Sequence, residues 1–284
     1  MRQGAYTDVG TIKESNEDSL LLKSVLTPCG PVGLAVVCDG VGGLDAGDYA
    51  SAFVAKRFEE WFDAELPNLM AEDAWSEANG LLAFRPRWEA LIKECNQELF
   101  GYGTQRDIRL GTTFTGVLVH GGQYLLLHVG DSRCYLVADQ GINLLTRDHT
   151  LMAREIARGA ITPEEAAVHP YRNVVMQAVG AQEELRPDIN VGCYPTGSLF
   201  LVCSDGLYHK LKPEEIWRGF AACLNQDDAQ IDETCQAAVE ACIRRGETDN
   251  ITVACLIPQD AVSDKEDQQV EAGIDEPALQ KESE

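Results

Sequence analysis

The strand-like and helix-like segments of this chain occur in blocks rather than in alternation. Apolar strand patterns at 18–23 and 32–38 precede helical patterns at 48–66 and 88–99, with a loop-like stretch at 67–86 between the two helices. Four short apolar segments follow at 112–119, 123–129, 134–138 and 141–145. Because only turn signals separate these four segments, we interpret them as a meander of antiparallel strands.

The second half of the chain keeps this block order. Its predicted helices lie at 151–158, 163–168, 213–222 and 231–245, and its predicted strands lie at 189–194, 198–203 and 250–257. A doubly wound parallel sheet places a helix between successive strands, which is not the order seen here. The grouping therefore predicts an α+β fold in which helices pack on antiparallel sheet.

Charge excludes several classes of partner. The 284 residues carry 46 acidic and 23 basic side chains, a net charge of −23. Such a surface repels nucleic acid and anionic membranes. No apolar run approaches the ~20 residues that span a bilayer, so we expect no membrane insertion. Carboxylates are, however, the ligands that Mg²⁺ and Mn²⁺ prefer.

The cysteines indicate the cellular compartment, and the composition of the C-terminal segment indicates where the folded domain ends. The ten cysteines include no C-x-x-C pair, and several lie within apolar runs, so we expect reduced thiols in a cytoplasmic protein. Residues 259–284 contain nine acidic side chains against two lysines and no aromatic residue. We therefore expect one folded domain at 1–258 and an acidic, disordered tail at 259–284.

Acidic residues stand at the ends of the predicted strands. They are Glu17, Asp18, Asp39, Asp131, Asp205 and Asp249. A single Asp-Gly pair is an ordinary turn, which is the structural alternative. Several carboxylates gathered at one end of a sheet repel one another unless a cation lies among them, and a hard divalent cation suits an all-oxygen ligand set. The spacing indicates a metal-dependent hydrolase.

Seven short motifs occur in a characteristic order. They are Lys13-Glu14-Ser15-Asn16-Glu17-Asp18, Asp39-Gly40-Val41-Gly42-Gly43, Gly111-Thr112-Thr113, Gly130-Asp131-Ser132-Arg133, Asp148-His149, Ser204-Asp205-Gly206-Leu207 and Asp249-Asn250-Ile251-Thr252. Together they resemble the motifs of the metal-dependent protein phosphatases, the PPM or 2C-type serine/threonine phosphatases, and above all their compact bacterial members. The resemblance covers Lys13 to Thr252.

The resemblance implies both a fold and a metal centre. The fold is a four-layer sandwich of two antiparallel β-sheets flanked by antiparallel helix pairs. The centre holds two Mn²⁺ or Mg²⁺ ions, with Asp39 bridging them and the Gly40 carbonyl binding one. Asp205 and Asp249 would bind the other ion.

Further acidic residues complete the implied centre. Glu17 and Asp18 would act mainly through metal-bound waters, and Asp131 with Asp205 would hold the third, weaker ion of bacterial relatives. In such centres a metal-bound water is the nucleophile, so that no side chain attacks phosphorus.

Three positions bear on substrate binding and proton transfer. Lys13 stands where many relatives have an arginine, so we expect looser phosphate binding; a solvated surface lysine is the alternative. Val41 replaces a histidine of animal relatives that is proposed to protonate the leaving group. His149 is a secondary candidate for that proton, although a structural histidine is the favoured interpretation. The segment 150–173 corresponds to the flap of such phosphatases.

These features predict a phosphoserine/phosphothreonine protein phosphatase that opposes a bacterial Ser/Thr kinase. Its partners would be phosphoprotein substrates, including the kinase and its targets, and we expect a monomer. Two alternatives remain: a catalytically weak family member that acts as a binding or sensor module, and a phosphatase of small phosphomonoesters.

Overall fold

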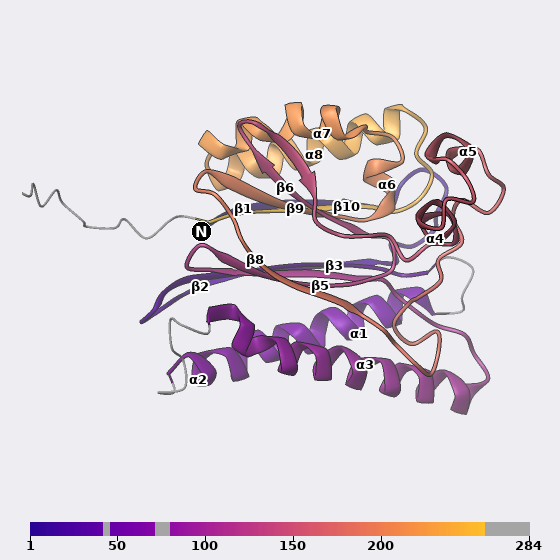
Figure 1. Cartoon of the computed structure of the whole chain (residues 1–284), viewed down its shortest axis with the longest axis horizontal. Helices are drawn as coiled ribbons and strands as arrows, with labels where there is room; N and C mark the ends of the chain where they lie inside the picture. The colour runs from indigo at the N-terminus through magenta and orange to yellow at the C-terminus, as the bar shows by residue number, and fades with distance from the viewer. Residues whose placement is uncertain (42–45, 72–79, 259–284) are drawn as a thin grey trace, which may run out of the picture.

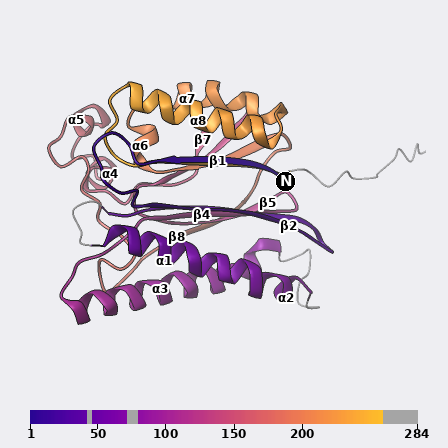
Figure 2. The ribbon, with the colours of Figure 1, turned by 180° about the vertical axis from the view of Figure 1, so that it is seen from behind.

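The computed structural model describes residues 1–41, 46–71 and 80–258. Two five-stranded antiparallel sheets lie face to face, and a pair of helices covers the outer face of each (Figure 1). The helices of each pair run in opposite directions, as the view from behind also shows (Figure 2). The predicted α+β four-layer sandwich is therefore confirmed.

The first sheet has the strand order β2-β3-β4-β5-β8. Its strands are β2 (Asp18–Thr27), β3 (Gly30–Asp39), β4 (Phe114–His120), β5 (Gln123–Val129) and β8 (Asp188–Cys193). The second sheet has the order β1-β10-β9-β6-β7. Its strands are β1 (Arg2–Asp8), β10 (Ile251–Ile257), β9 (Ser198–Cys203), β6 (Arg133–Ala138) and β7 (Gly141–Leu144).

Helices α1 (Gly47–Glu60) and α3 (Arg85–Arg106) cover the first sheet, and α7 (Pro213–Phe220) and α8 (Asp228–Arg244) cover the second. The central strand β3 shows why its apolar run is continuous. Leu34 and Val36 pack under α1 and α3, whereas Ala35 and Val37 face the other sheet. Alternate residues of a strand point to opposite faces, so both faces of β3 are buried.

The predicted meander is wrong. β4 and β5 form a hairpin in the first sheet, whereas β6 and β7 form a hairpin in the second. The chain crosses between the sheets at residues 130–132, where Gly130 has a φ of 105° that favours glycine. Turn residues mark the end of a strand but do not specify which sheet the next strand joins.

Other elements differ from expectation in smaller ways. β1 was not predicted, because Arg2–Asp8 has no apolar run and lies at a sheet edge. The helical pattern at 48–66 continues through a wider turn at Trp61–Glu65 into α2 (Leu66–Ala71), and Gly80–Phe84 forms a 3₁₀ turn, so 67–86 is not wholly loop.

Some predictions lie outside the described residues, namely the tail at 259–284 and the glycines at 42 and 43. In the part of the chain that is described, no helix is long and apolar enough to cross a membrane.

Candidate metal centre

Five aspartates meet at one end of the sandwich, the end where α4 (Leu151–Ala157), α5 (Pro163–Ala167) and α6 (Asp205–Tyr208) lie (Figure 1). Asp18 begins β2 and Asp39 ends β3, directly opposite each other in the antiparallel ladder. The remaining three come from the ends of strands in both sheets. We call Asp18, Asp39, Asp131, Asp205 and Asp249 the carboxylate cluster.

Small and hydroxyl-bearing neighbours hold Asp39 in place. Its backbone amide donates to Thr113 Oγ1 at 2.9 Å, and its carbonyl accepts from Thr112 Oγ1 at 2.9 Å. A Cβ on Gly40 would lie 2.7 Å from the Gly47 carbonyl carbon and 2.8 Å from the Glu17 oxygen. The Asp-Gly pair is thus required by close backbone approach at the start of α1.

Asp18 joins the two sheets at this end. Ser204 Oγ donates to Asp18 Oδ2 at 2.8 Å and accepts from the Thr252 amide at 2.9 Å. Among the described residues, the other carboxylate oxygen of Asp18, Oδ1, is buried without a hydrogen-bond partner. A buried carboxylate oxygen left unpaired is costly, and a cation is the partner that would satisfy it.

Burial and mutual repulsion raise the pKa values of four aspartates of the cluster, Asp18, Asp39, Asp131 and Asp205. The pKa of Asp39 lies well above its usual range because of burial and then the charges of Asp18, Asp205 and Asp131. Burial, followed by the charge of Asp249, raises the pKa of Asp205 to about 8. Burial likewise raises the pKa of Asp18 to about 6. The mutual contributions to these pKa values are those of carboxylates that lie close to one another.

The pKa of Asp131 is also raised by burial, to about 7, with the charge of Asp205 as the next cause. The Tyr208 hydroxyl fixes this turn by donating to the Asp131 carbonyl at 2.9 Å. Near Asp131, Arg133 binds Asp148 at 2.7 and 3.0 Å and stacks on the Tyr208 ring.

Lys13 lies within the site. Its Nζ is 3.0 Å from Asp249 Oδ1 and 3.4 Å from Glu17 Oε2. Burial alone would lower the pKa of Lys13, but hydrogen bonds and charges from Asp249 and Glu17 outweigh burial and raise it. Lys13 therefore lies against two carboxylates of this end of the sandwich, and its role in phosphate binding stays a prediction.

Asn250, which belongs to the last of the seven motifs, and Glu247, which the sequence did not single out, support the turns around Glu17 and Asp249. The buried Asn250 side chain accepts from the Glu17 amide at 2.8 Å and donates to the Ser15 carbonyl at 3.1 Å. The nearly buried Glu247 accepts from the Asp249 amide and adds to the negative field at Asp205. Asn250 is visible in the sequence as part of its motif, whereas adjacency to Asp249 is the sequence signal that could have found Glu247.

A cavity of about 630 Å³ opens over the cluster, and we call it the aspartate cavity. Asp131, Asp205 and Asp249 line one side of it. Residues of α4, α5 and the loop after them line the other, among them Met152, Ala166 and Arg172. The predicted flap segment at 150–173 thus forms a wall of the site.

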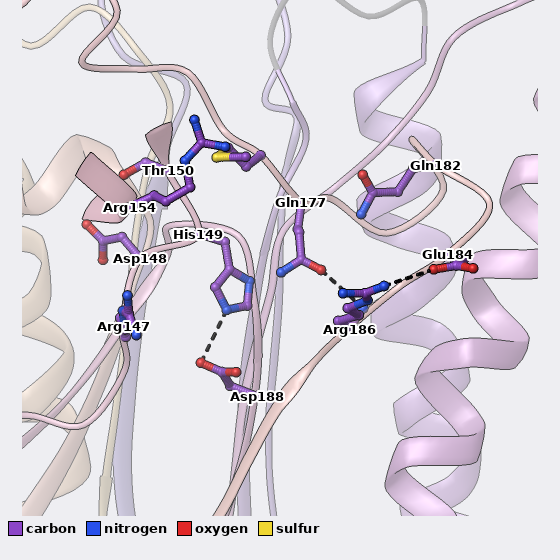
Figure 3. Close-up of a pocket in the computed structure, with 11 residues that line it drawn as sticks. Arg147, Asp148, His149, Thr150, Arg154, Gln177, Gln182, Glu184, Arg186 and Asp188 are labelled. Atoms are coloured by element: carbon purple, nitrogen blue, oxygen red, sulfur yellow. Dashed lines mark hydrogen bonds and ion pairs between the residues drawn. The ribbon is translucent and has the colours of Figure 1, made fainter. Parts of the chain in front are cut away.

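His149 does not line the aspartate cavity. Its Nε2 lies 3.3 Å from Asp188 Oδ2, and its Nδ1 accepts from the Gly130 amide at 3.3 Å (Figure 3). It is therefore placed at the junction of the flap with β8, which is the position of a structural histidine. A role as proton donor stays a prediction.

The donor chemistry of the site fits divalent cations. The cluster offers carboxylate oxygens, one of which, Asp18 Oδ1, lacks a hydrogen-bond partner among the described residues. No three Asp, Glu, His or Cys side chains among the described residues already surround one point as metal ligands. Lys13 pairs with Asp249, and Ser204 donates to Asp18.

Several known proteins are similar to this chain in sequence and in fold. A putative 2C-type protein phosphatase of Streptococcus pyogenes is 30% identical over 258 residues, which is 90% of this chain and 97% of that protein. The crystal structure of the serine/threonine phosphatase Stp1 from Staphylococcus aureus superposes with a TM-score of 0.76 at 27% identity, covering 91% of this chain and 96% of that one.

A second solved structure contains metal. It is the catalytic domain of the serine/threonine protein phosphatase PstP in complex with two manganese ions, with a TM-score of 0.70 at 28% identity and coverage of 89% and 96%. Full-length PstP of Mycobacterium tuberculosis is longer, and this chain spans 44% of it. Residues 13–243 match the protein phosphatase 2C family. The chain therefore belongs to the protein phosphatase 2C family.

Proposed function

We propose that this protein is a Mn²⁺- or Mg²⁺-dependent protein phosphatase that hydrolyses phosphoserine and phosphothreonine. The observation that carries the proposal is the gathering of buried, mutually repelling carboxylates at one end of a family fold in which a relative binds two manganese ions. Relatives at about 30% identity over nearly their whole length are named as phosphatases of this type.

We assign to the cluster the roles that its family motifs imply. Asp39 would bridge two ions, the Gly40 carbonyl would bind one of them, and Asp205 and Asp249 would bind the other. Glu17 and Asp18 would act through bound waters. When bound, two divalent ions lower the pKa of a shared water and offset the charge of the phosphate dianion. Asp131 lies beside Asp205, where a third ion would be held.

The chain's own residues would position the phosphate. Lys13 is paired with Asp249 in this structure. Once a cation neutralises the Asp249 carboxylate, the Lys13 ammonium group would be able to bind a phosphate oxygen. Val41 carries no proton to give, and His149 faces Asp188 instead of the aspartate cavity. The proton for the leaving alkoxide would then come from water at the centre.

The finer partners are also proposals. The protein would act as a cytoplasmic monomer that reverses a Ser/Thr kinase. A non-catalytic binding module is disfavoured because every predicted metal aspartate is present in the sequence and belongs to the cluster. A small-molecule phosphatase would share this site and differ only in its preferred substrate.

The decisive experiment is a Mn²⁺-titrated assay with a phosphothreonine peptide, a phosphotyrosine peptide and p-nitrophenyl phosphate. We expect metal-dependent turnover with preference for the phosphothreonine peptide. Asp39→Asn should lose at least ~100-fold in kcat, because it removes the bridging carboxylate. Absence of turnover with all three substrates at saturating Mn²⁺ would refute the enzyme. Faster turnover of small phosphomonoesters than of any phosphopeptide would favour the small-molecule alternative.

A further inference from the structure

A second cavity, of about 530 Å³, lies beside the aspartate cavity. Arg147, Arg154 and Arg186 line it, and we call it the arginine cavity (Figure 3). The two cavities share a wall, since Asp148 and Thr150 line both of them. One extended peptide can therefore reach both.

The walls of the arginine cavity are fixed by hydrogen bonds to regular elements. The Met176 amide donates to the His149 carbonyl at 2.7 Å, which joins the loop after the flap to the start of α4. On the opposite side, the buried Asn96 of α3 accepts from the Gly180 amide at 2.8 Å and donates to the Gln182 carbonyl at 3.0 Å. A cavity held in this way needs little ordering when a ligand binds.

The carboxylates on its walls are mostly engaged. Arg133 donates from Nε and Nη2 to the two carboxylate oxygens of Asp148, so the charge of Asp148 is offset within the protein. Asp188 pairs with His149. The third carboxylate, Glu184, is 81% exposed and contacts Arg186 at 3.3 Å.

The arginines are available to an incoming anion. No acceptor among the described residues binds the exposed Arg147 guanidinium. Arg186 is 84% exposed, and an ion pair between two such exposed groups contributes little to stability. Arg154 pairs with its sequence neighbour Glu155. Arg147 and Arg186 are therefore the guanidinium groups that an anionic ligand in the cavity can bind at the smallest cost.

We propose that the arginine cavity binds an anionic side chain of the phosphoprotein substrate while the phosphorylated residue occupies the aspartate cavity. The ligand chemistry is a carboxylate or a second phosphoryl group a few residues from the target phosphate. This inference rests on the proposed function. A preference for an anionic flanking residue is the opposite of what the net charge of −23 predicts, because a strongly acidic protein attracts basic peptides.

The test compares matched phosphothreonine peptides that carry Ala, Glu, Lys or a second phosphothreonine at each flanking position in turn. We expect one or two positions at which Glu raises kcat/KM over Ala by roughly threefold to tenfold and Lys lowers it. A larger gain for the second phosphothreonine identifies a phosphoryl site, and an equal or smaller gain identifies a carboxylate site.

Substitutions of the arginines test whether the preference for a flanking Glu arises in the arginine cavity. In Arg147→Ala/Arg154→Ala the preference for Glu should disappear through KM, whereas Arg158→Ala should retain it, because Arg158 is on the same segment but does not line the cavity. Arg147→Glu should shift the preference toward Lys. Turnover of p-nitrophenyl phosphate, which has no flanking residue, should be unchanged in all of these variants.

Two results separate failure of the subsite from failure of the enzyme. Equal kcat/KM for Ala and Glu peptides at every position, or a Glu preference that survives in Arg147→Ala/Arg154→Ala and Arg147→Glu, overturns the subsite while leaving the phosphatase intact. Lack of Mn²⁺-dependent turnover of every phosphopeptide overturns the proposed function and the subsite with it.

Discussion

Asp205→Asn removes one charge from the carboxylate cluster, and we expect it to stabilise the metal-free protein. Folding raises the pKa of Asp205 from its ordinary value of 3.8 to about 8, by burial first and then by the charges of Asp249 and Asp18. Between those values the folded chain binds a proton that the unfolded chain releases, so the free energy of unfolding falls as the pH rises from about 4 to about 8.

The size of the effect follows from the same shift. At about 1.36 kcal/mol per pKa unit, the upper limit of the penalty at neutral pH is about 4 kcal/mol. Sharing of protons within the cluster and local relaxation reduce this limit, so we expect a gain of about 1–3 kcal/mol for the neutral asparagine. In a domain of this size the corresponding rise in Tm is roughly 2–10 °C.

The assay is thermal unfolding in EDTA at about pH 5 and about pH 7.5, followed by addition of Mn²⁺. The gain of Asp205→Asn over wild type should be larger at the higher pH, where more of the penalty applies. Mn²⁺ at about 100 times its Kd should stabilise wild type by about 2.7 kcal/mol and the variant much less, because a ligand has been lost.

Asp139→Asn is the matched control, because it makes the same charge change in the exposed β6–β7 turn. Its unfolding free energy should stay within about 0.5 kcal/mol of wild type at both pH values. The reasoning is refuted if metal-free Asp205→Asn is less stable than wild type at about pH 7.5 and still gains the full Mn²⁺ stabilisation.

Three further substitutions probe single contacts of the site. Lys13→Ala should raise KM for a phosphopeptide by roughly 3- to 30-fold with a smaller change in kcat, because it removes a phosphate contact; unchanged steady-state kinetics would exclude that contact. Ser204→Ala should lower the unfolding free energy by about 1–3 kcal/mol and weaken Mn²⁺ binding, measured by chemical denaturation and calorimetry, because it leaves Asp18 Oδ2 without its donor. His149→Gln should lower Tm but keep turnover of a phosphothreonine peptide, and loss of that turnover with aryl phosphate hydrolysis intact would instead make His149 the proton donor.

Local patterns predicted the strands that later form hairpins, because alternation and turn residues act over a few positions. β5 and β9 begin and end where the sequence placed them. The same patterns missed β1, whose edge position needs little apolar character, and joined β6 to the wrong sheet. Pairing between distant strands depends on packing across the whole sandwich, which a local pattern does not contain.

The residues of the candidate site could be predicted from the sequence, but the contacts between them could not. Aspartates at strand ends are visible in the sequence, and the family motifs indicated which of them belong together. The ion pair of Lys13 with Asp249 joins residues that are far apart in the sequence. The hydrogen bond from the Glu17 amide to the Asn250 side chain does the same. Such contacts arise only when β10 pairs between β1 and β9 in its sheet.

By itself, the sequence determined the antiparallel α+β class, the acidic character and the set of carboxylates at strand ends, because these depend on residue type and short-range order. Tertiary structure alone decided that His149 faces Asp188 and not the carboxylate cluster, and that three arginines from separate segments surround a cavity beside that cluster. The physical reason is that electrostatic energy and burial depend on distances in space, which only the packed sandwich sets.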